Sequence, residues 1–326
     1  MKGGVNEQKS CPRCSSIEVQ FHGRTIQGKQ RFRCKICSKT YIWKANYNKK
    51  AREKKWFQLW VGESYSVRQL CQLSGYSRSK LNRIRQYWLP KLPLEEMNYS
   101  LFKYLVYDGT YFHKDGCLIN LMNAPDQKII SYIYTQKEGY YNVLDWFKRL
   151  KEKGLNPQCI SMDGERSVIK AIKTIWPHVK IQRCLWHIQR EGMRWLRTYP
   201  KTQAGRDFRY LLSSLCAVRS LPGRDLFINS FESWLHKYED FISSLPRTVV
   251  AFKDLKKTIT LIKSALPDMF YYLSNSAIYS TTNVLESFHS RLKADYRRHR
   301  GLTRKNRINY LAWYCYLKNG LKTNTS

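Results

Sequence analysis

Residues 102–134 read FKYLVYDGTYFHKDGCLINLMNAPDQKIISYIY, and this stretch decides the fold. It predicts three antiparallel strands from three apolar runs, which lie at residues 102–107, 117–122 and 129–134. Asp115-Gly116 favours a tight hairpin turn between the first two runs, and Ala-Pro-Asp favours a second turn before the third. The stretch therefore predicts a meander of three strands at the start of a larger domain.

Helical and strand patterns alternate after this meander. A helix is expected over residues 141–153, where Val143, Phe147 and Leu150 share one face and Gly154 ends it. The elements that follow are expected to be a strand at 158–162, a helix over the apolar positions 168–175, and a strand at 179–182. A ribonuclease-H-like sheet has this order, so we predict an α/β fold with a ribonuclease-H-like core.

Two Cys-x-x-Cys pairs lie near the N-terminus with 19 residues between them, and they consist of Cys11, Cys14, Cys34 and Cys37. Each pair places two thiolates on one tight turn, and two such turns can close a tetrahedral Zn²⁺ site. The segment between them reads as two short strands with a glycine-containing turn, which is typical of a zinc ribbon. We predict structural Zn²⁺ rather than disulfides, because no apolar signal-peptide core precedes the pairs. A redox or chance pairing is the alternative.

Residues 66–88 contain two helical patterns joined at Gly75, with Ser66 and Ser77 placed to cap them. The residues expected to pack the two helices together are Leu70, Leu73, Leu81 and Ile84. This pattern predicts a helix-turn-helix whose second helix contacts DNA. Its candidate DNA-binding residues are Arg78, Lys80, Arg83 and Arg85. An ordinary pair of antiparallel helices is the alternative.

Long helical patterns replace the strands from residue 188 to residue 275, which predicts an all-helical insertion into the core. The core is expected to resume at residue 276 and to end with a helix at 308–317. The predicted domains are the zinc ribbon, the helix-turn-helix with its linker, the first part of the core, the helical insertion and the C-terminal part of the core. Their expected boundaries are 1–47, 48–97, 98–187, 188–275 and 276–326.

Basic residues far outnumber acidic ones, with 58 Lys and Arg against 24 Asp and Glu and a formal net charge of +34. Residues 1–90 carry 20 basic and 4 acidic side chains, and residues 291–307 carry 8 basic and 1 acidic. Such a charge calls for a polyanionic partner, of which nucleic acid is the first candidate and an anionic membrane surface the second. A membrane-spanning protein is excluded, since no run of 18 apolar residues occurs. The second basic segment is expected to contact phosphates through Arg291, Lys293, Arg297, Arg298 and Arg300.

Three carboxylates lie at predicted element ends. Asp108 follows the first strand, Asp163 follows the fourth, and Glu286 begins a helix beside the basic segment. Ligand sites of open α/β sheets form at strand ends. Carboxylates gathered there would repel one another unless divalent cations bound them, and oxygen ligands suit Mg²⁺ or Mn²⁺. The structural alternatives are a turn at Asp108, a helix cap at Asp163 and a capping box of Asn283 with Glu286.

With these residues in place, the chain resembles the DDE transposases of the Mutator-like superfamily, including their bacterial insertion-sequence relatives. The matching segments are Tyr-Asp108-Gly-Thr-Tyr-Phe, Met-Asp163-Gly, Cys184-Leu-Trp-His187 and Thr-Thr-Asn283-Val-Leu-Glu286-Ser. The resemblance covers roughly residues 100–320. It implies that Asp108, Asp163 and Glu286 are the catalytic residues and bind Mg²⁺ or Mn²⁺. It also implies a supporting role for Cys184 and His187, with ordinary packing as the alternative for His187.

The resemblance implies a DNA transposase that binds the terminal inverted repeats of its mobile element. It would cleave a strand by hydrolysis and join the freed 3′-OH to target DNA. The implied partners are double-stranded DNA and further copies of the chain, with no membrane partner and a cytoplasmic, nucleoid-associated location in a bacterium. Two alternatives stay open: a non-catalytic, sequence-specific DNA-binding regulator derived from a transposase, and a ribonuclease-H-like nuclease without strand transfer.

Overall fold

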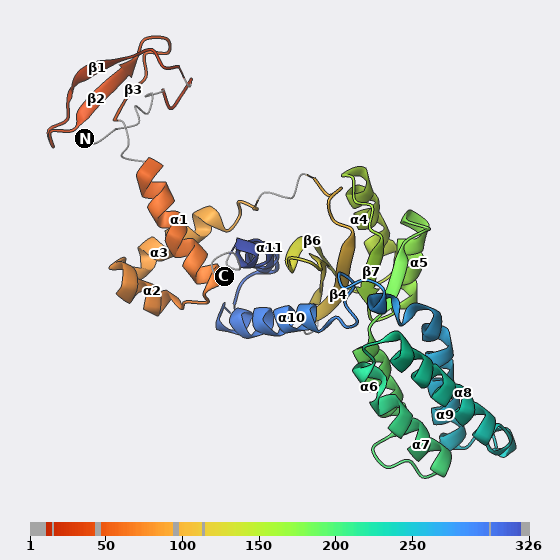
Figure 1. Ribbon diagram of the computed structural model, residues 1–326. Coiled ribbons are helices and arrows are strands. Elements are labelled where there is room, and N and C mark those ends of the chain that lie inside the picture. The colour runs from red at the N-terminus through yellow and green to blue at the C-terminus, as the bar shows by residue number, and fades with distance from the viewer. Residues whose placement is uncertain are drawn as a thin grey trace, which may run out of the picture. The chain divides into compact units, whose positions relative to one another are not determined.

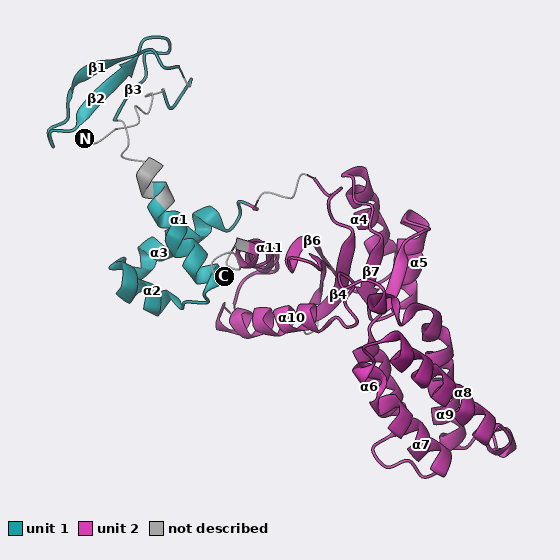
Figure 2. Cartoon of the chain, viewed as in Figure 1, with its two compact units in different colours: residues 1–91 teal, residues 92–326 magenta. Residues whose placement is uncertain are grey.

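The computed structural model describes residues 11–14, 16–42, 47–93, 98–112, 115–299 and 301–320. The chain divides into two compact units, residues 1–91 and residues 92–326 (Figure 2). No helix among the described residues is both long and apolar enough to cross a membrane.

The first part of unit 1 is a three-stranded antiparallel sheet of order β1-β2-β3 (Figure 1). Its strands are β1 (Val19–Arg24), β2 (Gln30–Cys34) and β3 (Thr40–Ile42). The two predicted strands are confirmed as β1 and β2, which pair from Val19 opposite Cys34. The sequence pattern does not predict β3, because three residues are too few to show a period of two.

Three helices make up the rest of unit 1: α1 (Tyr47–Gly62), α2 (Val67–Ser74) and α3 (Arg78–Trp88). The predicted caps are confirmed, since Ser66 accepts a hydrogen bond from the backbone of Gln69 and Ser77 accepts one from the backbone of Lys80. Gly75 ends α2 in the left-handed conformation, with φ of 68°. The predicted packing is wrong at Leu73, which is 58% exposed. α1 contacts both other helices and supplies the buried Phe57, Trp60 and Val61 to this unit.

Unit 2 contains a five-stranded sheet of order β6-β5-β4-β7-β8. Its strands are β4 (Tyr104–Phe112), β5 (Gly116–Asn123), β6 (Lys128–Thr135), β7 (Cys159–Met162) and β8 (Lys180–Arg183). The meander β4-β5-β6 is antiparallel as predicted, and β7 and β8 continue the sheet parallel to β4. The predicted end of the first strand is wrong, because β4 stays paired with β5 as far as Phe112 opposite Gly116. Asp108 therefore lies inside the strand and not at its end.

Helices cover both faces of this sheet (Figure 1). Alternate residues of β4 face opposite sides, so Tyr107 packs against Phe147 of α4 while Asp108 faces α10. The first face is covered by α4 (Tyr140–Glu152) and α5 (Arg166–Ile175), which bury the main core of unit 2. The second face is covered by α10 (Asn283–Tyr296) and α11 (Arg304–Gly320).

Between β8 and α10 the described chain forms helices and no strand, as predicted. The main ones are α6 (Leu185–Leu196), α7 (Gln203–Ser213), α8 (Leu221–Ser244) and α9 (Val250–Ala265). They enclose a core of their own, in which Phe208 stacks on Trp234 with ring centroids 4.1 Å apart. The side chain of Gln182 on β8 donates a hydrogen bond to the backbone oxygen of Met269 at 2.7 Å, which ties this helical part to the sheet.

Candidate active site

Asp108 lies on the face of β4 that α10 covers, and its Oδ2 is 3.0 Å from Nδ1 of His289. The other ring nitrogen of His289 lies 2.9 Å from Oδ1 of Asn120, the residue opposite Asp108 on β5. Asn120 donates a hydrogen bond to Sγ of Cys315 at 3.4 Å. This buried chain of polar groups fixes the Asp108 carboxylate. The sequence points to His289 only through its place three residues after Glu286.

Asp163 directly follows β7, the parallel neighbour of β4. The two strands pair through Val106 and Ser161, so Asp108 and Asp163 each lie two residues further along. Oδ1 of Asp163 accepts a hydrogen bond from the backbone nitrogen of Glu165 at 3.0 Å. The helix-cap alternative for Asp163 is wrong, because Glu165 is the N-cap of α5. The sheet thus brings the first two predicted carboxylates to the same level of neighbouring strands.

Glu286 lies in the first turn of α10, where Thr282 and not Asn283 is the N-cap. The capping-box alternative is therefore wrong. Oε1 of Glu286 accepts a hydrogen bond from the Thr282 hydroxyl at 3.0 Å, and the Glu286 side chain remains 30% exposed. The carboxylate is held by one short bond and stays accessible to a ligand.

Cys184 and His187 at the start of α6 meet the N-cap of α10. The backbone nitrogen of Thr282 donates a hydrogen bond to Sγ of Cys184 at 3.3 Å, and Nδ1 of His187 lies 3.8 Å from Oε1 of Glu286. Burial alone would lower the pKa of His187, but its hydrogen bond with Cys184 and the charges of Cys184, Glu286 and Asp163 raise the pKa to about 9. His187 therefore carries a positive charge at neutral pH and attracts both carboxylates.

A fourth carboxylate, Glu138, lies in the loop between β6 and α4. The Tyr107 hydroxyl donates a hydrogen bond to its Oε1 at 2.6 Å, and its Oε2 would lie 3.0 Å from a Cβ placed on Gly109. Burial raises the pKa of Glu138 to about 7, with the charges of Asp163 and Asp108 adding to the effect against the hydrogen bond from Tyr107. The sequence gives no signal for Glu138, because no motif surrounds it.

The three predicted carboxylates are linked through shared neighbours. Asp108 and Asp163 both raise the pKa of Glu138, and Asp163 and Glu286 both raise that of His187. Their oxygens are not all within 4.8 Å of one another, since among the described residues only a group of four cysteines meets that condition.

That group of cysteines is the predicted zinc site of Cys11, Cys14, Cys34 and Cys37. The sulfurs of Cys11 and Cys37 are 3.5 Å apart, and those of Cys14 and Cys34 are 3.6 Å apart. Zn–S bonds of about 2.3 Å in a tetrahedron require sulfurs roughly 3.8 Å apart. The four thiols fit this requirement closely, and the donor set supports structural Zn²⁺.

The four basic residues predicted to contact DNA from α3 lie in two environments. Arg78 and Arg83 are exposed. Lys80 forms an ion pair with the buried Glu53, and the guanidinium of Arg85 lies over an indole ring of α1 at 4.6 Å. Arg78 and Arg83 are therefore the two residues of this set that are directly available to a phosphate.

The C-terminal basic residues lie at the end of α10 and just beyond it. Arg291, Arg297 and Arg298 are exposed, whereas Lys293 is half-buried with its Nζ 5.9 Å from the ring centroid of Phe112. Arg300 lies outside the described residues. Three of the five predicted phosphate contacts thus present their charge to solvent.

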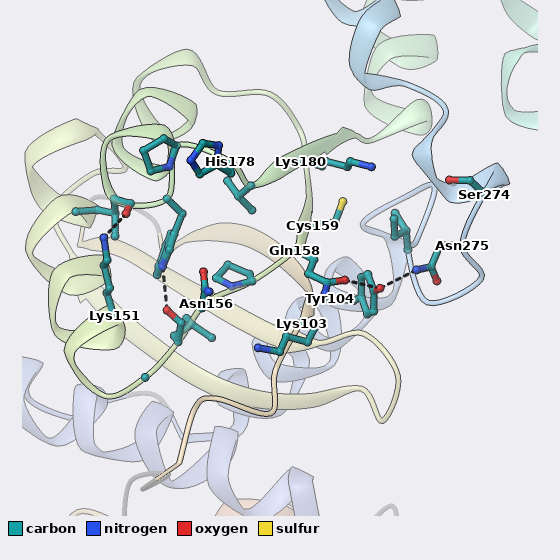
Figure 3. A pocket seen from close by; sticks show the side chains of 18 residues that line it. Lys103, Tyr104, Lys151, Asn156, Gln158, Cys159, His178, Lys180, Ser274 and Asn275 are labelled. Atoms are coloured by element: carbon teal, nitrogen blue, oxygen red, sulfur yellow. Dashed lines mark hydrogen bonds between the residues drawn. The ribbon is translucent and has the colours of Figure 1, made fainter.

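A cavity of about 920 Å³ opens at the other end of the parallel strands (Figure 3). It adjoins the residues that begin β4, β7 and β8, whereas Asp163 follows the end of β7. No acidic side chain among the described residues lines it, and its basic residues include Lys103, Lys151 and Lys180. Without a carboxylate this cavity offers no site for a divalent cation, so the candidate active site is the group around Asp108, Asp163 and Glu286.

Residues 104–191 match the MULE transposase domain, and residues 8–38 match the InsA N-terminal domain, a zinc ribbon. The two matches support a Mutator-like transposase with an N-terminal zinc ribbon. The resemblance drawn from the sequence is confirmed. The MULE transposase domain runs from β4 into α6, so it contains Asp108, Asp163, Cys184 and His187 and ends before Glu286. A domain of this kind suggests an enzyme of the polynucleotidyl transferase type.

A comparison with curated proteins gave no match. One solved structure with a similar chain is the simian T-cell lymphotropic virus intasome in complex with PP2A regulatory subunit B56 gamma. The similarity has a TM-score of 0.22 at 10% sequence identity and covers 67% of this chain and 66% of that one, just under two thirds of its length. A TM-score this low does not relate the fold of the MULE transposase domain to that structure.

Proposed function

We propose that the chain is a DDE-type DNA transposase with a ribonuclease-H-like core. The observation that carries the proposal is the position of Asp108 and Asp163 at one level of neighbouring parallel strands. Glu286 is linked to this pair through His187, on which the charges of both Glu286 and Asp163 act. Nδ1 of His187 lies 3.8 Å from Oε1 of Glu286. The match to a MULE transposase domain supports the same chemistry.

Asp108, Asp163 and Glu286 would hold Mg²⁺ or Mn²⁺, since carboxylate oxygens suit these cations. Bound there, such cations would supply activation of an attacking oxygen and stabilisation of the leaving oxygen in phosphoryl transfer. The chain itself places the carboxylates: His289 fixes Asp108, and Thr282 fixes Glu286.

Cys184 and His187 take a supporting role. Burial alone would raise the pKa of Cys184, but its hydrogen bonds with His187 and Thr282 lower the pKa and link the start of α6 to the start of α10. The positive charge of His187 offsets part of the repulsion between Asp163 and Glu286. The cluster therefore joins the start of α6 to the helix that carries Glu286.

In the proposed reaction, water attacks a phosphate at the end of the mobile element and breaks its bond to the 3′ oxygen. The freed 3′-OH then attacks a phosphate of the target DNA and displaces the 3′ oxygen of the target strand, so one site performs both steps. The zinc ribbon and a helix-turn-helix of α2 and α3 recognise the terminal inverted repeats, with Arg78 and Arg83 contacting the DNA. Arg291, Arg297 and Arg298 hold backbone phosphates beside the carboxylates. Two copies or more act together, because two ends must be processed.

A plasmid cleavage assay tests the proposal. With Mg²⁺ and supercoiled DNA carrying the flanking repeats of the reading frame, the unmodified chain should nick and join strands. D108N, D163N and E286Q should each lower cleavage by at least a hundredfold and leave DNA binding unchanged. The control is D145N, which removes one acid from a side chain on α4 that is 79% exposed.

Each outcome has a definite meaning. Full cleavage by one of the three variants would remove that residue from the catalytic set. Binding of the repeats without any cleavage by the unmodified chain would replace the proposal with a non-catalytic DNA-binding regulator. Cleavage without strand joining would replace it with a ribonuclease-H-like nuclease.

A further inference from the structure

A second cavity, of about 480 Å³, opens directly beside Asp163, between the sheet and the helical part of unit 2. Gly164 and Arg183 line it at the ends of β7 and β8, and Arg166 lines it at the start of α5. The opposite wall is formed by Trp195 of α6 and by Lys256 and Lys257 of α9. The helical part therefore contributes most of the lining of a cavity that adjoins a proposed catalytic carboxylate.

The lining of this cavity is cationic. Of the residues that the structure describes, two arginines and two lysines face it, and no acidic side chain does. Within the described part of the chain, none of these four side chains forms an ion pair with a carboxylate. The charges of Asp163 and Asp268 act on Arg183, but these two acids do not balance the four cations. The remaining positive charge favours an anionic ligand, and phosphate is the anion that arginine and lysine bind best.

Arg183 is built into this wall with unused hydrogen-bonding capacity. One of its terminal nitrogens donates to the backbone oxygen of Asp163 at 3.3 Å, while its buried Nε has no partner among the described residues. Gly164 adopts φ of 105°, and a Cβ at this position would overlap the guanidinium. The backbone beside Asp163 thus has to be glycine for Arg183 to lie where it does. The buried Nε is closed to solvent, so a ligand oxygen would contact the guanidinium through its other nitrogens.

Trp195 adds a different kind of contact. Its indole is half-buried in the cavity wall, and no other described residue of the lining is aromatic. Aromatic rings bind unpaired bases by stacking, and neighbouring arginines and lysines bind the phosphates of the same strand. A nucleotide carries both groups. A cavity of this volume holds one nucleotide and is too small to admit a double helix.

We propose that this cavity receives one unpaired nucleotide of the DNA strand next to the phosphate on which the carboxylates act. Arg183 and Lys257 contact its phosphate, and its base stacks on Trp195. The inference rests on the proposed function, because it is the neighbouring Asp163 that makes DNA the ligand. The helical part of unit 2 then binds the unpaired end of a DNA strand next to the proposed catalytic residues.

The test is equilibrium binding of the full-length chain, without divalent metal, to two labelled duplexes of one sequence. One duplex is blunt, and the other ends in a three-nucleotide overhang. We expect the overhang to bind about tenfold more tightly, the size of effect that stacking of a base on one aromatic ring produces. W195A and K256A/K257A should abolish this preference. W195F should retain it, since it keeps an aromatic face.

The matched control is K253A/K263A, which removes two exposed lysines from the same helix outside the cavity and should keep the preference. A preference that survives in W195A, or that the control loses equally, would overturn the proposal. A second measurement uses 5-iododeoxyuridine in the overhang. Its photocrosslink should map to the peptide containing Trp195, and a crosslink found only in unit 1 would contradict the assignment. Neither measurement requires cleavage. Failure of the proposed catalytic function and failure of the proposed nucleotide site can therefore be distinguished.

Discussion

Oδ2 of Asp108 lies 3.0 Å from Nδ1 of His289, although the two residues are 181 positions apart in the chain. The side chains are 12% and 4% exposed, so the contact is shielded from water. Asp108 belongs to β4, and His289 belongs to the helix that carries Glu286 one turn earlier. The contact therefore sets the position of the third proposed carboxylate relative to the first.

Replacing His289 should disturb metal use more than DNA binding. H289A removes the donor to Asp108, and we expect a cleavage rate at least tenfold lower with a higher Mg²⁺ concentration at half-maximal rate. H289N should recover part of the loss, because its amide can donate from nearly the same place as Nδ1. The measurement is the rate as a function of Mg²⁺ concentration. An H289A variant that folds and keeps the same Mg²⁺ dependence would show that His289 serves packing alone.

The raised pKa of Glu138 predicts a pH-dependent stability. Its folded pKa of about 7 lies above the ordinary value of 4.5, so the folded state binds the proton more tightly. The contribution of Glu138 to the free energy of unfolding is fully present below its ordinary pKa of 4.5 and is lost as the pH rises through 7. The loss is no more than about 3 kcal/mol. E138Q keeps the acceptor for Tyr107 without the charge. Its melting temperature should match that of the unmodified chain at pH 5 and exceed it at pH 8. Equal differences at both pH values would contradict the assignment.

Gly164 and Gly154 form a matched pair. Both have left-handed φ angles, of 105° and 92°, but a Cβ at Gly164 would overlap Arg183 whereas a Cβ at Gly154 would meet its nearest atom at 3.8 Å. G164A and G154A should each lower the free energy of unfolding by about 1–2 kcal/mol through backbone strain. Only G164A should also displace Arg183 and weaken the preference for the overhang duplex. Calorimetry and the binding assay measure the two effects, and an equal loss of preference in G154A would refute the role of Arg183.

The cysteine cluster predicts about one zinc ion per chain. C34S removes a buried ligand, so the purified variant should lack zinc and lose the ordered β1-β2-β3 sheet, because folding of such small units depends on the metal. Unit 2 should keep its melting transition, since it is a separate compact unit. Elemental analysis and hydrogen exchange make the measurement, with C216S as a control from the helical part. Retention of zinc by C34S would contradict the site.

The features predicted well from the sequence are those that depend on neighbours in the chain. The strands of the meander follow from alternating apolar residues, and the caps at Ser66 and Ser77 follow from serine before a helical pattern. The apolar pattern predicts that β4 ends at Tyr107. The true end of the strand could not be predicted from neighbouring residues, because pairing with β5 keeps Asp108 within the strand. The exposure of Leu73 likewise does not follow from its apolar pattern, and α1 supplies buried side chains to this unit instead.

The sequence by itself determined the cysteine spacing, the alternation of elements, the concentration of positive charge and the three carboxylates that belong to recognisable motifs. Tertiary structure alone decided which distant partners those carboxylates meet: His289 for Asp108, His187 for Glu286, and Glu138 as a neighbour of the first pair. It alone formed the cationic cavity beside Asp163 from α5, α6, α9 and two strand ends. The physical reason is that hydrogen bonds and charges act over a few ångströms in space, whereas a sequence pattern records only residues that are close along the chain.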